Sequence, residues 1–128
     1  MDVVQSISKT SKQAQLQQLA HTDGYGCRLV EQRYCVAMGT HFQMEIGQYF
    51  DLVLKNGVVI PCILGDVKNP DHCDKSNIFS NTNQNLCASE FIVDIEKLNT
   101  EAKKRGDISF ISYQWNSPVK EVIVYQKF

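Results

Sequence analysis

Two acidic residues stand at the edges of apolar segments, where a rigid backbone could hold them in place. Asp66 follows an apolar run through Gly65, and Glu90 opens a second apolar run after Ser89. Burial and a nearby like charge both raise the pKa of a carboxyl group, which is a common way to build an acid catalyst. The same pattern arises when Asp66 caps a turn and Glu90 faces solvent at a strand end. The residues alone leave both interpretations open.

The segment between these acids contains a dense group of metal-capable side chains, residues 71–74 (D-H-C-D). Oxygen, imidazole and thiolate ligands could together bind zinc. Adjacent residues seldom point at one atom, however, and no second ligand set with a metal-site spacing is evident. We therefore predict a solvated loop with no metal and no cofactor. Within it His72 and Asp74, together with the preceding Lys68, are candidate substrate contacts.

Two further residues are candidate substrate contacts. His41 follows the segment V-A-M-G-T and could border a groove, although a loop histidine is the plainer interpretation. Trp115, beside Asn116, is the aromatic residue best placed for partial exposure, and such rings often stack on sugars, although core packing is their commoner use. A thiol site built from Cys73 and the adjacent histidine is not favoured, because sequence neighbours seldom reach the geometry that a nucleophile and its base require.

Length and charge exclude several classes of protein. A chain of 128 residues predicts one folded domain, and a net charge of -1 gives no electrostatic case for nucleic acid or an anionic membrane. No apolar run approaches the roughly 20 residues that cross a bilayer. The first residues lack a basic segment followed by an apolar one, so we expect synthesis in the cytoplasm without a signal peptide of its own. Five cysteines, an odd number with no C-x-x-C pair, argue against a disulfide scaffold.

The chain divides into a polar N-terminal segment and a β-rich remainder. Residues 1–23 predict a helical arm or linker, with a helix over 12–20 capped by Ser11 or Thr10. Residues 24–128 predict a small six-stranded barrel with one short helix and a long loop. Asn56-Gly57 indicates a hairpin, and Pro61 indicates an edge position or a bulge. The expected strands are 28–38, 48–54, 58–64, 90–95, 108–115 and 119–126; the expected helix is 95–105, ended by Gly106, and the expected loop is 69–86.

Five short motifs give the chain a family resemblance that covers roughly residues 33–126. They are V-A-M-G-T (36–40), E-I-G-Q-Y-F (45–50), D-L-V-L-K-N-G-V-V-I (51–60), L-G-D-V-K (64–68) and S-E-F-I-V-D (89–94). Their order resembles the double-psi β-barrel domains of cell-wall enzymes. These include RlpA-like domains, three-aspartate domains, MltA-type lytic transglycosylases and the expansin catalytic domain.

The resemblance implies a peptidoglycan-cleaving lytic transglycosylase whose two acids face each other across a groove. By this correspondence Asp66 takes the first acidic position and Glu90 the second, with Glu90 as the acid and Asp66 tuning it. The chain departs from the pattern in having Glu at the second position and Val67-Lys68 where glycines are usual. Similar chains also occur in phage tails, so the resemblance implies action at the cell wall as a virion component, with residues 1–23 contacting other tail subunits.

A second interpretation comes from a different class of protein. The same barrel could be a non-catalytic structural or glycan-binding module of a larger assembly, joined to it through residues 1–23. An enzyme would depend on Glu90, whereas a module of this kind would depend more on the N-terminal segment. The separation of the two carboxylates in the folded chain distinguishes the two interpretations most directly, since a value under about 8 Å across a solvent-lined cleft would favour chemistry.

Overall fold

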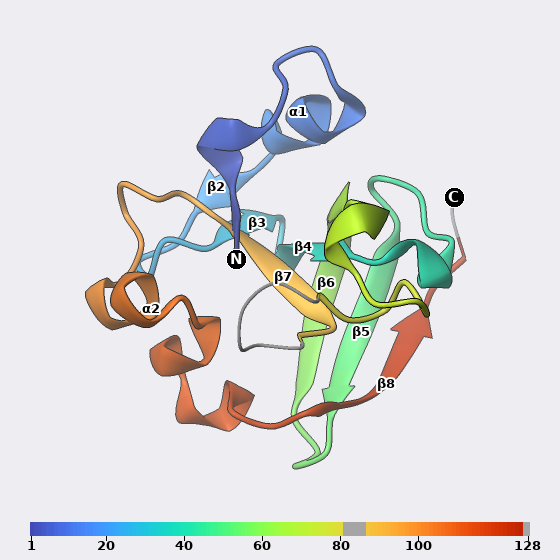
Figure 1. Ribbon diagram of the computed structural model, residues 1–128. Coiled ribbons are helices and arrows are strands. Elements are labelled where there is room, and N and C mark those ends of the chain that lie inside the picture. Colours follow the sequence, from blue (N-terminus) through green and yellow to red (C-terminus); the bar gives the residue numbers. More distant parts are fainter. Residues whose placement is uncertain (81–86, 127–128) are drawn as a thin grey trace.

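The computed structural model describes residues 1–80 and 87–126, and over these residues the chain is mainly β (Figure 1). Of the loop predicted over 69–86, residues 81–86 lie outside the described residues. The strands are β1 (Asp2–Val3), β2 (His21–Thr22), β3 (Arg28–Val30), β4 (Arg33–Met38), β5 (Tyr49–Leu54), β6 (Val59–Val67), β7 (Ser89–Val93) and β8 (Val119–Val124). The helices are α1 (Lys12–Gln17) and α2 (Thr100–Arg105), with 3-10 turns η1 (Val4–Ser6), η2 (Thr40–Phe42), η3 (Pro70–His72), η4 (Ile108–Ile111) and η5 (Tyr113–Trp115).

Strand β4 is the centre of a mixed sheet. On one side it pairs in parallel with β6. On the other side its first residues pair antiparallel with β3 and its last residues pair antiparallel with β7. The order across the sheet is β1-β7-β4-β6-β5-β8, and over the described residues the end strands β1 and β8 do not pair with each other. The sheet is therefore open. The closed six-stranded barrel that the sequence predicted is not confirmed.

The predicted hairpin is confirmed. Strands β5 and β6 pair antiparallel around Asn56-Gly57, where Gly57 has a φ of 90° and the Asn56 side chain accepts a hydrogen bond from the amide of Val58. Pro61 lies opposite Asp51 of β5, and pairing of β6 with β4 begins only one residue later. Pro61 therefore occupies the edge position that proline requires, as its missing N–H predicts.

The N-terminal residues fold onto the sheet, and the separate helical arm is not confirmed. Strand β1 pairs in parallel with β7, and β2 pairs with β3. Helix α1 begins where predicted, because the Ser11 hydroxyl accepts a 3.1 Å hydrogen bond from the amide of Ala14, but it ends at Gln17. Figure 1 shows the N-terminus beside β7 and α1 at one end of the molecule. The segment is part of the same fold as the rest of the chain.

Side chains from alternate strand positions build two apolar layers, one on each face of the sheet. The larger layer includes Val36, Phe50 and Leu52, and Ala102 of α2 packs into it. The smaller layer consists of Val30, Cys35, Ile63 and Ile92, and it is covered by Val4, Ile7 and Leu16 from the N-terminal segment. Burial of this kind is worth about 25 cal/mol per Å² of apolar surface, so the segment and the sheet stabilise each other.

The predicted strand over residues 108–115 is wrong. This stretch forms the two 3-10 turns η4 and η5, and the Asp107 carboxylate accepts hydrogen bonds from the amide and the hydroxyl of Ser109. Local capping of this kind competes with strand pairing. The helix before it is shorter than expected, but it ends at Gly106 as predicted. Gly106 has a φ of 64°, in the left-handed region. Among the described residues no helix combines the length and apolar character needed to span a bilayer.

Candidate functional site

Asp66 and Glu90 lie on strands that flank the same residue. Ala37 of β4 pairs with Asp66 of β6 on one side and with Glu90 of β7 on the other. The register of β4 against β6 shifts between Val36 and Ala37, which leaves Gly65 as an extra residue. Such a bulge changes the direction of the next side chain. Because strands are spaced about 4.8 Å apart, two strand spacings, about 10 Å, separate the two acidic residues along the sheet.

A third acid joins them from the N-terminus. Strand β1 places Asp2 opposite Ile92, and the Asp2 side chain hydrogen-bonds Asp66. Burial raises the pKa of Asp2 to about 8, and the hydrogen bond to Asp66 and the charges of Asp66 and Glu90 act in the same direction. The terminal amino group of Met1 acts in the opposite direction. Asp2 therefore keeps its proton at neutral pH.

The geometry of Asp2 agrees with that protonated state. Its Oδ2 is buried, and within the described part of the chain no N–H or hydroxyl group donates a hydrogen bond to it. A buried carboxylate oxygen without a donor is costly. A proton on the Asp2 carboxyl group, shared with the Asp66 carboxylate, gives both groups a hydrogen bond.

The other two acids are half-buried and have donors of their own. Asp66 Oδ1 accepts hydrogen bonds from the Gln13 side chain at 3.2 Å and from the amide of Val67 at 2.8 Å. Glu90 Oε1 accepts one from the buried hydroxyl of Ser80 at 2.9 Å and a weaker contact from the Cys87 thiol at 3.9 Å. These contacts fix both carboxylates while leaving part of each exposed.

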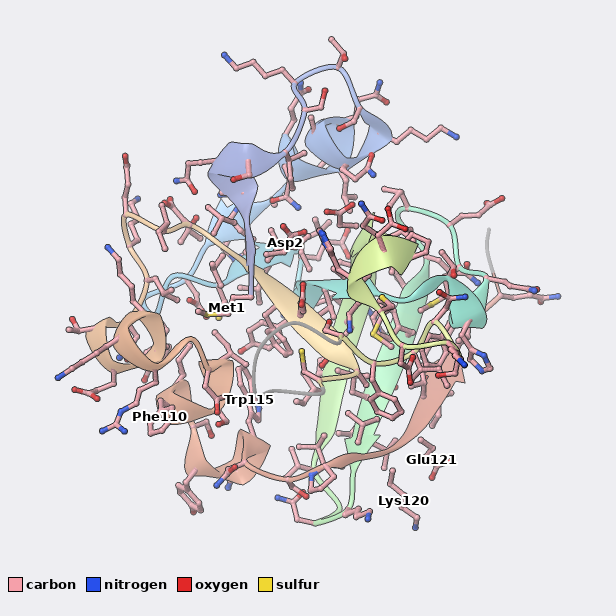
Figure 2. The ribbon with its side chains drawn as sticks, viewed as in Figure 1. Met1, Asp2, Phe110, Trp115, Lys120 and Glu121 are labelled. Carbon is pink, nitrogen blue, oxygen red and sulfur yellow. The ribbon has the colours of Figure 1, made fainter. Side chains whose placement is uncertain are left out.

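A cavity of about 910 Å³ lies beside Glu90. Phe91 and Leu52 contribute apolar walls, and Met1 and Trp115, labelled in Figure 2, line it from distant parts of the chain. Its volume falls within the range of about 300–1,000 Å³ typical of small-molecule sites. Of the two acids predicted from the sequence, Glu90 lines this cavity and Asp66 is not among the lining residues. Glu90 is thus the acid with access to a bound ligand.

Trp115 is the one predicted substrate contact that lines this cavity. Its ring packs edge-on against Tyr34, with ring centroids 5.1 Å apart, and at a tilt against Phe91, with centroids 5.0 Å apart. These contacts hold the ring in one orientation while it stays half-exposed. A fixed, partly exposed indole is suited to stacking on a planar or sugar face.

Lys68 has a different place from the one predicted. The residue is only 6% exposed, and its ammonium donates hydrogen bonds to the carbonyls of Cys87 at 2.7 Å and Ile78 at 3.4 Å. The lysine therefore joins two loop segments to strand β6. It is not a lining residue of the cavity beside Glu90.

The remaining predicted contacts also lie away from that cavity. His72 is exposed in η3, and His41 is exposed in η2, where its ring lies edge-on to Phe42 at 5.1 Å. Asp74 closes a turn, and hydrogen bonds from the Ser76 hydroxyl and from backbone amides lower its pKa. The described residues contain no group of three or more His, Cys, Asp or Glu side chains arranged to hold a metal ion.

Asp2, Gln13 and Ser80 are the site residues that the sequence reasoning missed. Ser80 and Gln13 stand in polar stretches without any chemical motif. Asp2 precedes Val3-Val4, and these two β-branched residues are the only local indication of a strand there. Their pairing with a strand about 90 positions later leaves no trace in the local sequence.

No protein-family model, no curated protein and no solved structure matches this chain. The chemistry is therefore argued from the side chains of the site. Three carboxyl groups belong to the site, and the raised pKa of Asp2 leaves a protonated carboxyl group beside Asp66 at neutral pH. A lined cavity beside one of them provides room for a ligand.

Proposed function

We propose that the protein is a glycan-cleaving enzyme of the lytic transglycosylase type, with Glu90 as its acid and base and Asp66 as the partner acid. One observation carries this proposal: Ala37 of β4 pairs with Asp66 on one side and with Glu90, which lines the cavity, on the other. Peptidoglycan as the substrate, the double-psi relationship and a place in a phage tail rest on the sequence resemblance.

The reaction needs one proton donor and no water. A carboxyl group at Glu90 gives its proton to the leaving glycosidic oxygen as the bond from that oxygen to the anomeric carbon breaks. The sugar's own 6-hydroxyl oxygen then bonds to the anomeric carbon and forms a 1,6-anhydro ring. The hydroxyl proton returns to the Glu90 carboxylate, so the enzyme ends in its starting state.

The cavity beside Glu90 supplies the binding site that this reaction needs. Trp115 offers a ring for stacking on a sugar, and Lys55 and Asp107 add polar groups that can bind hydroxyls. This arrangement supports a glycan chain as the ligand.

The N-terminal segment changes how the alternative interpretation is tested. Residues 1–23 cover one face of the sheet, so their deletion would damage the fold whether or not the segment serves assembly. A substitution within the site is therefore the more informative experiment. A glycan-binding module would keep the cavity and lack the cleavage.

The test is Glu90→Gln, assayed on purified cell walls by mass spectrometry of released 1,6-anhydro muropeptides. The amide keeps the acceptor for Ser80 and loses the titratable proton, so we expect release to fall at least about 100-fold with little change in thermal stability. Glu121→Gln is the matched control, because Glu121 is exposed on β8, away from the cluster (Figure 2). Binding of wall fragments by the wild type without any release would instead support the non-catalytic module.

A further inference from the structure

Several contacts fasten the N-terminal segment beside the acids. Strand β1 pairs with β7, and the Gln5 side chain donates a 2.7 Å hydrogen bond to Asp94 and accepts one from the amide of Ile95. Farther along the segment, Gln13 of α1 donates to Asp66. Asp2 is thus placed by backbone pairing and by polar contacts that do not involve its own side chain.

The charged groups around Asp2 are mostly of one sign. Asp66 approaches it from β6 and Glu90 acts on it from β7, while the amino group of Met1 is the opposing charge next to it in the chain. The α1 side chain at this place, Gln13, is neutral and contacts Asp66. Full ionisation would place three negative charges together, which a half-buried site disfavours.

We propose that Asp2 is a positioning residue of the glycan-cleaving site: its carboxyl group, brought to the site by the pairing of β1 with β7, holds the Asp66 side chain through a shared proton. This inference rests on the function proposed above and adds strand β1 to the site. The shared proton fixes the orientation of Asp66. While the Asp2–Asp66 pair retains this proton, the electric field that the pair exerts at Glu90 stays constant. When the proton leaves, two repelling carboxylates replace one hydrogen-bonded pair.

Two substitutions separate the role of the proton from the role of the side chain. Asp2→Asn keeps a donor to Asp66 at every pH, so it imitates the protonated acid. Asp2→Ala removes the hydrogen bond altogether. Gln5→Ala is the control, because it weakens the anchoring of the same segment while leaving the Asp2–Asp66 pair intact.

The first measurement is the pH profile of 1,6-anhydro muropeptide release. We expect wild-type activity to decline as the pH rises through about 8, where Asp2 ionises. Asp2→Asn should retain neutral-pH activity within about twofold and lose this decline, while Asp2→Ala should fall at least about tenfold because Asp66 is misplaced. Gln5→Ala should keep the wild-type profile. An Asp2→Asn profile that declines like the wild type would overturn the proposal.

The second measurement does not depend on catalysis. Infrared difference spectra across a pH titration should show a protonated carboxyl band at pH 7 in the wild type that is missing in Asp2→Asn. If this band is absent from the wild type, the shared proton is refuted even in an active enzyme. If the band is present but no wall fragments are released at any pH, the function proposed above fails, and the role of Asp2 in cleavage falls with it.

Discussion

Asp66 and Glu90 are held at a common level of the sheet because both pair with Ala37, one from each side of strand β4. A single buried alanine thus sets the position of two acids that are 24 positions apart in the chain, from residue 66 to residue 90. Strand β4, which carries no acid, is therefore the element on which the candidate site depends most.

The stability of the protein should respond to the ionisation of Asp2. The pKa of Asp2 is raised from 3.8 to about 8 in the folded chain, so the folded state binds a proton that the unfolded state has released. The stabilisation is complete below about pH 4 and is lost as the pH rises through about 8. Because the site is partly exposed, we expect a loss on the order of 2 kcal/mol.

Urea unfolding of the wild type and Asp2→Asn at several pH values measures this loss. The difference between the two free energies of unfolding should change with pH in favour of Asp2→Asn as the pH rises. Glu121→Gln serves as the reference, since Glu121 is exposed on β8 and its difference from the wild type should stay flat. A constant difference for Asp2→Asn as well would show that Asp2 titrates normally.

Ligand binding should be visible in the intrinsic fluorescence of the protein. Trp115 is the single tryptophan of the chain, and it lines the cavity beside Glu90. A sugar stacked on the indole displaces water from it, so we expect a blue shift and a saturable intensity change when soluble peptidoglycan fragments are added. Glu90→Gln should give the same change without turnover. Fragments that alter no emission would place the glycan elsewhere.

The end of strand β4 should tolerate no side chain at Gly39. A Cβ atom there would lie 1.9 Å from the backbone oxygen of Asn77, whose carbonyl also accepts a hydrogen bond from the amide of His41. Backbone cannot move aside as a flexible side chain can, so Gly39→Ala should lower the free energy of unfolding by about 2–3 kcal/mol. Gly24→Ala, with nothing within 4 Å of its Cβ, should change it by less than about 1 kcal/mol. Equal unfolding midpoints for both variants would contradict this expectation.

The sequence predicts those features that local chemistry determines. The Asn56-Gly57 hairpin, the Ser11 cap and the end of α2 at Gly106 each depend on a few adjacent residues, and each is confirmed. The predominance of strands over helices follows equally from the apolar alternation of the sequence. The stretch over 108–115 has the composition of a strand, but capping by Asp107 overrides it.

Features that depend on contacts between residues far apart in the chain could not be predicted from the sequence. Lys68 looks like an exposed contact, and only the carbonyls of Ile78 and Cys87 make its burial possible. Asp66 and Glu90 could be named as acids at strand ends, but their common neighbour follows from a register shift in β4. Asp2 could not be recognised at all, because its partner in the neighbouring strand, Ile92, comes about 90 positions later in the chain.

The pairing of β1 with β7 also sets the order in which the molecule can be completed. During synthesis the first strand leaves the ribosome long before residues 92 and 93, its partners, have been made. Until then the apolar residues of the N-terminal segment have no finished surface to cover. Long-range parallel pairing is slow to form. The carboxyl cluster can therefore assemble only after residues 92 and 93 have been made.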